Sequence, residues 1–185
     1  MSRKSGPYFC NRSNLKSYNL SGLNILILEG SDLISELLDT VCLTFGIPIR
    51  RMADDPKWAF DILAAKPVDI VITDWAPGLD GIQFMERIRR EPLNPDPYVP
   101  IIVCSGYNDM NRVLTARDAG MNEYLVKPFN AKSIYARFVA VIENQRSFVL
   151  SANFNGPDRR RRGDANRAAP DRRRVARIEV AAVGA

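Results

Sequence analysis

Four polar residues each stand directly after an apolar run of the sequence, namely Glu29, Asp74, Ser105 and Lys127. Together they offer two carboxylates, a hydroxyl and an ammonium group. Two carboxylates with a backbone carbonyl suit Mg²⁺, which prefers hard oxygen ligands. An aspartate can also act as a nucleophile and form an acyl phosphate, whose oxygens a neighbouring cation and hydroxyl would stabilise. If the fold brings these side chains together, we expect a site that accepts a phosphoryl group.

Asp74 is the residue on which this interpretation depends most. Residues 68–73 are mainly apolar or β-branched, which is typical of a buried parallel strand, and Asp74 ends that strand. Pro77-Gly78 then favours a turn, and Asp80-Gly81 precedes the next helical pattern. Aspartate is also frequent at strand-to-turn steps for structural reasons alone, so the rest of the chain has to decide between the two interpretations.

Five strand patterns alternate with five helical patterns along the chain, and we expect Ser31 or Asp32 to cap the first helix. This alternation predicts an α/β fold, in which a doubly wound, five-stranded parallel sheet carries helices on both faces. Ligand sites of such sheets lie just beyond the carboxyl ends of the strands, so the four polar residues should meet at one rim. The expected strands cover residues 23–28, 47–52, 68–73, 101–104 and 123–126.

Composition excludes several kinds of function. The chain has no histidine, which removes histidine-based general base catalysis, the usual zinc sites and any role as a phosphohistidine carrier. No apolar run is long enough for a transmembrane helix. Three cysteines without metal-ligand spacing, Cys10, Cys42 and Cys104, fit a reducing, cytoplasmic compartment.

The net charge of +5 is concentrated near the C-terminus. Residues 1–150 hold 17 basic and 17 acidic residues, whereas residues 151–185 hold nine arginines and four acidic residues. The motif Pro-Asp-Arg-Arg-Arg begins at Pro157 and again at Pro170. Low hydrophobicity and high charge predict disorder for this tail. It is expected either to contact polyanions such as nucleic acid or anionic lipid, or to be simply solvated.

We therefore divide the chain into three parts. Residues 1–21 are polar and form a flexible N-terminal arm, residues 22–148 form one globular domain, and residues 149–185 form a disordered, arginine-rich tail.

The order and spacing of several short motifs add a family resemblance. Over about residues 22–146 the sequence resembles a response-regulator receiver domain of two-component signalling. That resemblance implies a flavodoxin-like sheet with strand order 2-1-3-4-5. The motifs are Asp74-Trp75 with Pro77 and Asp80-Gly81, Cys104-Ser105-Gly106, Ala119-Gly120, and Tyr124-Leu125-Val126-Lys127-Pro128-Phe129.

The resemblance implies a role for each matching residue. Asp74 would accept the phosphoryl group, Lys127 would contact the acyl phosphate, and Ser105 would bind the phosphoryl oxygens and reorient. Tyr124 matches the aromatic switch position, and the Lys127-Pro128 bond is typically cis in this family. Three of these residues also have an ordinary interpretation. Lys127 could be a surface lysine, Ser105 a turn serine and Tyr124 a packed strand aromatic.

The implied metal site departs from the family pattern at two points. Mg²⁺ would be held by Glu29, Asp74 and the backbone carbonyl of Ala76. Receivers normally carry two adjacent acids after the first strand, but Gly30 replaces the second one here. The turn after Asp74 is also one residue short. We therefore expect Mg²⁺ to bind weakly.

Two hypotheses about function remain open. The first is a stand-alone response regulator, not an enzyme, that takes a phosphoryl group on Asp74 from a histidine kinase or phosphotransfer protein and signals to a downstream protein by contact. The alternative is a phosphorylation-independent pseudo-receiver scaffold, tethered to nucleic acid or membrane by the tail of residues 151–185. Both are compatible with a homodimer.

Overall fold

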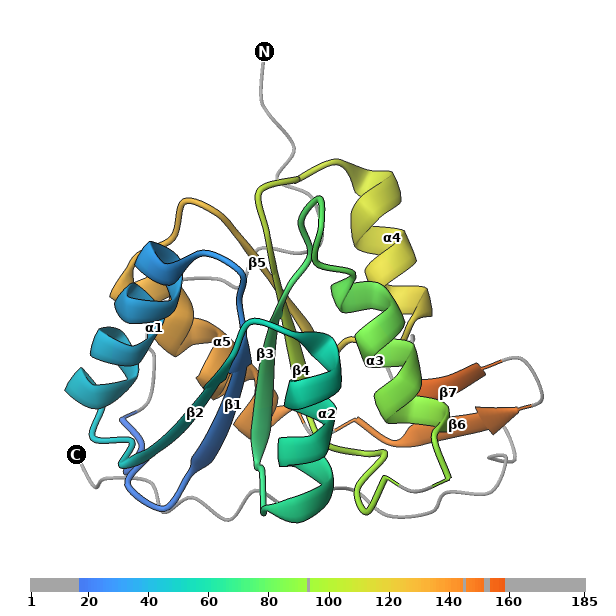
Figure 1. Cartoon of the computed structure of the whole chain (residues 1–185), viewed down its shortest axis with the longest axis horizontal. Coiled ribbons are helices and arrows are strands. Elements are labelled where there is room, and N and C mark those ends of the chain that lie inside the picture. The colour runs from blue at the N-terminus through green and yellow to red at the C-terminus, as the bar shows by residue number, and fades with distance from the viewer. Residues whose placement is uncertain (1–16, 93, 145, 152–153, 159–185) are drawn as a thin grey trace.

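The computed structural model describes residues 17–158, apart from residues 93, 145 and 152–153. A parallel sheet forms its centre, with strand order β2-β1-β3-β4-β5 (Figure 1). The expected α/β fold and strand order are confirmed. The strands of this sheet are β1 (Asn24–Leu28), β2 (Ile49–Ala53), β3 (Ile70–Asp74), β4 (Ile101–Ser105) and β5 (Glu123–Val126). The helices are α1 (Asp32–Thr44), α2 (Pro56–Ala65), α3 (Gly81–Arg90), α4 (Met110–Asp118) and α5 (Ala131–Glu143).

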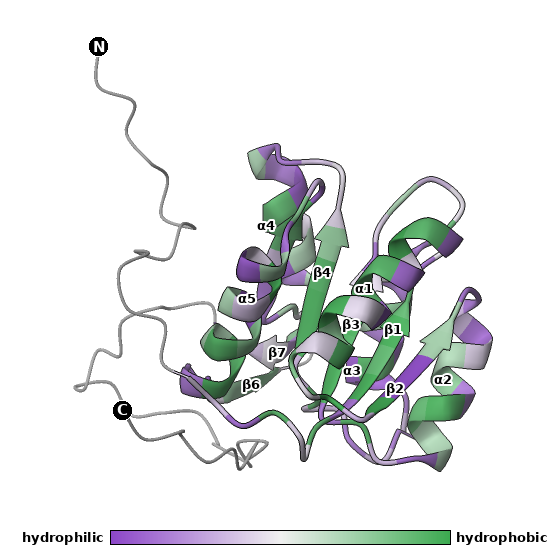
Figure 2. Cartoon of the chain, turned by 90° about the vertical axis from the view of Figure 1, so that its left-hand side faces the viewer, coloured by the Kyte–Doolittle hydropathy of each residue, from purple (hydrophilic) through white to green (hydrophobic). Residues whose placement is uncertain are grey.

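Helices cover both faces of the sheet and bury a hydrophobic core on each side. One core packs residues of α1 and α5 against the strands, and the other packs residues of α2, α3 and α4 against the opposite face. In Figure 2 the central strands are mainly hydrophobic, whereas the edge strand β2 includes hydrophilic residues. All residues of β3 and β4 are buried, as continuous apolar runs predict for strands covered on both faces.

Side-chain caps start four of the five helices. The cap at the start of α5 is reciprocal, since Asn130 accepts from the Ser133 N–H and the Ser133 hydroxyl accepts from the Asn130 N–H. Ser31 occupies the cap position of α1, but its side chain makes no capping hydrogen bond. The Glu29 carboxylate instead accepts from the Ser31 N–H at 3.1 Å. The caps of α2, α3 and α4 are Asp55, Asp80 and Asp109.

Strand β2 begins two residues later than predicted, because Ile47 belongs to the end of α1. Gly46 has a φ of +75°, and its N–H donates to the Leu43 carbonyl. The Ile47 N–H donates to the Cys42 carbonyl, which completes a Schellman motif. The Ile47 side chain is fully buried, so it helps to seal the helix end against the core.

The last residues of the predicted N-terminal arm pack on α5. The Tyr18 N–H donates to the Tyr135 hydroxyl, and the Tyr18 hydroxyl donates to Glu143, both at 2.9 Å. Leu20 is buried in the core. The arm expected at residues 1–21 therefore differs from the structure over residues 17–21, and residues 1–16 lie outside the described residues.

The predicted disordered tail differs from the structure at its beginning. Strands β6 (Phe148–Ser151) and β7 (Phe154–Pro157) form an antiparallel hairpin below α3 (Figure 1). Phe148 is buried and its ring packs edge-on against Tyr98. The boundary expected at residue 148 is therefore too early, because the hairpin belongs to the packed domain. The rest of the tail, residues 159–185, lies outside the described residues.

A buried arginine explains why the hairpin packs there. Arg89 of α3 is 1% exposed, and burial lowers its pKa to about 9. Its guanidinium lies over the ring of Phe148, and the Asn155 side chain of β7 donates to the Arg89 carbonyl. The other contacts of this guanidinium are hydrogen bonds to the carbonyls of Pro97, Val99 and Gly120 and to the side chain of Asn122.

Replacing this cation should destabilise the domain strongly. Arg89→Leu leaves several buried carbonyl oxygens without a donor, and each lost partner is costly. We expect the free energy of unfolding to fall by about 2 to 4 kcal/mol, measured by urea denaturation. The control is Arg90→Leu, because Arg90 is exposed on the same helix and should change stability by only about 0.5 kcal/mol. Equal effects of both variants would contradict the role assigned to Arg89.

A truncation that tests polyanion binding should keep the hairpin, because the hairpin is part of the packed domain. Removing residues 159–185 takes away nine arginines and three acidic residues while it keeps β7. We expect the shortened chain to lose binding to duplex DNA or anionic vesicles, and binding by the full chain to fall steeply as salt rises. Gel-shift and vesicle sedimentation assays at two salt concentrations measure this. Equal binding with and without these residues would exclude the polyanion role.

Candidate functional site

The structure brings three of the four predicted residues into direct contact at the carboxyl end of the sheet. The Lys127 ammonium lies 2.7 Å from Oε2 of Glu29 and 2.9 Å from Oδ1 of Asp74. Lys127 follows β5, Glu29 follows β1 and Asp74 ends β3, so the parallel strands of one sheet place all three residues at the same rim. The Lys127-Pro128 peptide bond is cis, as the resemblance implied.

The charged groups at this rim interact strongly because they are largely shielded from water. Glu29 and Asp74 are each 4% exposed, and Lys127 is half-buried. Burial raises the pKa of Glu29, with a further rise from Asp74, whereas Lys127 and the Ser31 N–H act to lower it. Burial alone would lower the pKa of Lys127, but the two carboxylates outweigh it and raise this pKa. Two buried carboxylates therefore share one ammonium group.

Oδ1 of Asp74 is enclosed beside Lys127. This oxygen is buried and has no hydrogen-bond partner among the described residues, although Lys127 forms an ion pair with it. The ammonium of Lys127, 2.9 Å away, therefore balances the charge of this buried oxygen.

Ser105, the fourth predicted residue, lies at the same rim but is bonded to the backbone. Its hydroxyl donates to the Trp75 carbonyl at 3.0 Å and accepts from the Tyr107 N–H at 3.3 Å. The predicted switch residue Tyr124 donates its hydroxyl to the Tyr107 carbonyl at 2.8 Å. Burial raises the pKa of this phenol. Both switch residues therefore connect to the loop between β4 and α4 through Tyr107.

The expected metal ligand Ala76 stands in a tight turn. The Ala76 carbonyl accepts from the Leu79 N–H at 3.1 Å, and Gly78 has a φ of +88°. Proline followed by glycine with positive φ is the pattern of a type II turn. The carbonyl that the resemblance assigns to the metal is thus already the acceptor of the turn.

The described residues do not fit the resident Mg²⁺ site that the resemblance implies. Gly30 offers no carboxylate, and a Cβ built there would lie 3.8 Å from the buried side chain of Leu79. No group of three or more histidines, cysteines and acidic residues in the described part of the chain could hold a metal ion. The Lys127 ammonium already pairs with both remaining carboxylates.

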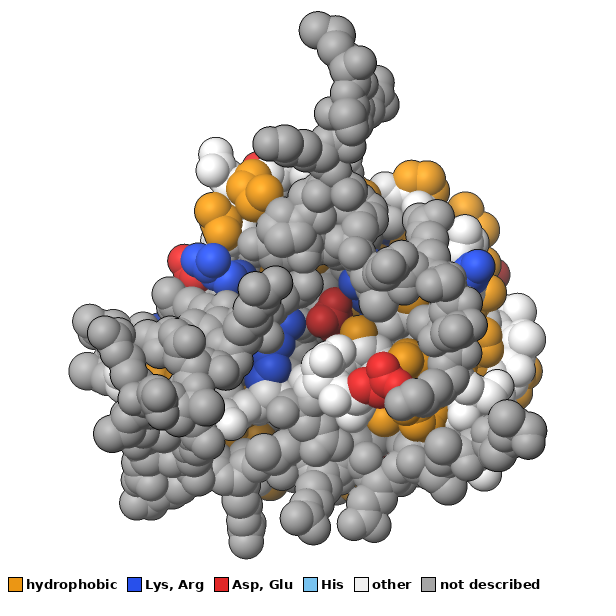
Figure 3. Space-filling view, turned by 180° about the vertical axis from the view of Figure 1, so that it is seen from behind, with side chains coloured by type: hydrophobic (Ala, Val, Ile, Leu, Met, Phe, Trp, Pro, Cys, Tyr) orange, Lys and Arg blue, Asp and Glu red, His pale blue; other side chains and the backbone are white. Residues whose placement is uncertain are grey.

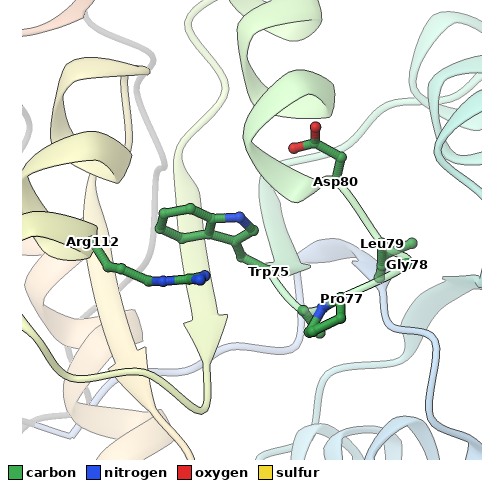
Figure 4. A pocket seen from close by; sticks show the side chains of 7 residues that line it. Trp75, Pro77, Gly78, Leu79, Asp80 and Arg112 are labelled. Carbon is green, nitrogen blue, oxygen red and sulfur yellow. The ribbon is translucent and has the colours of Figure 1, made fainter.

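A pocket next to this rim was not predicted from the sequence. Its volume is about 440 Å³, and it lies between the turn after β3 and the first turn of α4 (Figure 4). The guanidinium carbon of Arg112 lies 3.7 Å from the ring centroid of Tyr107 and 4.7 Å from that of Trp75. Arg112 is one of many arginines in the sequence, so only the folded chain singles it out.

The sequence matches the family model of the response regulator receiver domain over residues 25–139. The chain belongs to this receiver family. It is 26% identical to chemotaxis protein CheY-3 of Vibrio cholerae over 122 residues, which cover 65% of this chain and 92% of that protein. It is 36% identical to transcriptional regulatory protein KdpE of Staphylococcus aureus over 121 residues, 64% of this chain but only 49% of KdpE.

A solved structure supports the fold of this receiver. The chemotaxis response regulator CheY4 of Vibrio cholerae matches with a TM-score of 0.57 and 20% identity, over 63% of this chain and 95% of that one. In the described part of the receiver, no helix is long and apolar enough to cross a bilayer.

Restoring the missing acid should restore metal binding. Gly30→Asp adds a carboxylate beside Glu29 without a steric clash, so we expect Mg²⁺ affinity to rise at least about tenfold. Trp75 fluorescence reports the titration once Trp58→Phe removes the other tryptophan. Gly22→Asp is the control, because it adds the same charge in open space before β1, away from the rim. If the unaltered chain already binds Mg²⁺ as tightly as Gly30→Asp, Gly30 does not weaken the site.

Proposed function

We propose that this receiver accepts a phosphoryl group on Asp74 from the phosphohistidine of a histidine kinase or phosphotransfer protein. The observation that carries the proposal is the ion pair at the end of β3, where the Lys127 ammonium lies 2.9 Å from the carboxylate of Asp74. A carboxylate oxygen attacks phosphorus, the phosphorus–nitrogen bond of the donor breaks, and its electron pair stays on the imidazole nitrogen.

Lys127 and Ser105 would stabilise the product of this transfer. Lys127 would stay beside Asp74 and neutralise charge on the acyl phosphate oxygens. The Ser105 hydroxyl would leave the Trp75 carbonyl and donate to a phosphoryl oxygen. Because Tyr107 bonds both Ser105 and Tyr124, that movement would reach the loop before α4 and the aromatic switch position.

The readout we propose is a protein contact on the face of α4, β5 and α5. Seen from behind (Figure 3), hydrophobic side chains are exposed at the end of the molecule that carries the start of α4. Tyr107 and Met110 are 39% and 51% exposed there. We also propose that the protein acts in the cytoplasm and contacts a downstream protein. It would form a homodimer and bind Mg²⁺ weakly.

The pseudo-receiver is a second candidate because the metal site is incomplete. Gly30 removes one carboxylate, the turn uses the Ala76 carbonyl, and Lys127 pairs with both remaining acids. In that case the Glu29–Lys127–Asp74 cluster would be a permanent ion network, and the fold would serve as a scaffold without a phosphoryl cycle.

Labelling with a small acyl phosphate in the presence of Mg²⁺ tests the proposal. We expect the intact mass of the unaltered chain to rise by one phosphoryl group, and Asp74→Asn to show no such rise. Asp80→Asn is the control, since Asp80 caps α3 in the same loop and asparagine can also cap.

Continued labelling of Asp74→Asn would show that another residue carries the phosphoryl group. No labelling of the unaltered chain, together with labelling of Gly30→Asp, would favour the pseudo-receiver.

A further inference from the structure

The pocket beside the rim is a site of its own. Its walls come from the turn after β3 and from one residue of α4 (Figure 4). None of the rim residues Glu29, Ser105 and Lys127 lines it. The lining residues are Trp75, Ala76, Pro77, Gly78, Leu79, Asp80 and Arg112.

Arg112 is held in place by contacts that leave its hydrogen-bond donors unused. Its guanidinium stacks on the rings of Tyr107 and Trp75, which restrains the side chain. No hydrogen bond or ion pair joins the guanidinium to any residue that the structure describes. The backbone of Arg112 is fixed as well, because its N–H donates to the capping carboxylate of Asp109. A stacked guanidinium with free donors is preorganised to bind an oxyanion with two parallel hydrogen bonds.

The other groups of the pocket leave this cation available. Asp80 is the acid among the lining residues, and its carboxylate accepts from the Gln83 N–H at the start of α3. That hydrogen bond directs part of its charge toward the positive end of the helix. The remaining lining side chains are apolar or aromatic. The N–H donors of this one guanidinium should bind a dianion more tightly than a carboxylate. The dianion carries twice the charge and accepts the same two parallel hydrogen bonds.

We propose that this pocket binds a phosphate-type dianion through Arg112. Trp75 both lines the pocket and follows Asp74 directly, so a bound phosphate lies beside the phosphoacceptor rim. The anion is either free phosphate or the phosphate of an organic monoester. A role in receiving phosphoryl donors rests on the proposed function, whereas binding itself does not.

Direct binding measurements separate this site from phosphorylation. Inorganic phosphate and phenyl phosphate are titrated against the full chain at constant ionic strength, with phosphorus NMR line broadening and calorimetry as readouts. We expect saturable binding that weakens at least about tenfold in Arg112→Gln, since a charge-assisted bidentate pair is lost. Arg117→Gln is the matched control, because Arg117 lies on the same helix but outside the pocket and pairs with Asp118. That control should bind as the unaltered chain does.

The two anions identify the source of the ligand. Tighter binding of phenyl phosphate supports an organic monoester whose ring uses the walls at Trp75 and Pro77, and preference for inorganic phosphate supports the free ion. Asp74→Asn should keep phosphate binding, so a chain that binds phosphate but is never phosphorylated refutes the proposed function alone. Absence of saturable binding, or affinities of Arg112→Gln and Arg117→Gln that agree within about twofold, overturns the proposal.

Discussion

The carboxyl end of this sheet depends on one ammonium group held between two buried carboxylates. Lys127 contacts Glu29 and Asp74 at 2.7 and 2.9 Å, and these three side chains come from three different strand ends. Without the lysine, two negative charges would be buried close together, which is costly in a poorly solvated site. The ion network therefore links the geometry of β1, β3 and β5 to the charge state of the rim. Any group that joins Asp74 has to share this lysine with Glu29.

Another cation, Arg89, is almost fully buried and organises a different part of the domain. Among the described residues, the Arg89 guanidinium has no carboxylate as a hydrogen-bond partner, and its donors bind carbonyl and amide oxygens. Such a guanidinium tolerates burial because several partial negative charges replace water around it. The two cations work differently. Lys127 balances the formal charges of Glu29 and Asp74. Arg89 binds loop carbonyl oxygens and lies over the ring of Phe148 in the hairpin.

The sequence predicted the sheet and the rim residues well because both rest on local patterns. Continuous apolar runs marked β3 and β4, and each of the polar residues Glu29, Asp74 and Lys127 followed a run directly. The parts that sequence reasoning missed depend on contacts between distant residues. The hairpin packs on Arg89, which lies in α3, and Arg112 becomes distinctive only when the fold stacks it on Trp75. The sequence likewise did not show that the Ala76 carbonyl accepts the hydrogen bond that closes the turn.

The packed hairpin determines where the residues that follow it are attached to the domain. Asp158 donates its N–H to the Ser147 carbonyl, so the described chain ends at a fixed point next to the hairpin rather than at the free end of α5. The effective concentration of a tethered segment near any surface depends on its anchor point and its length. For residues 159–185 that anchor is residue 158, on the side of the receiver that carries the Arg89 cluster. The attachment point of residues 159–185 therefore lies beside the hairpin and α3, not at the end of α5.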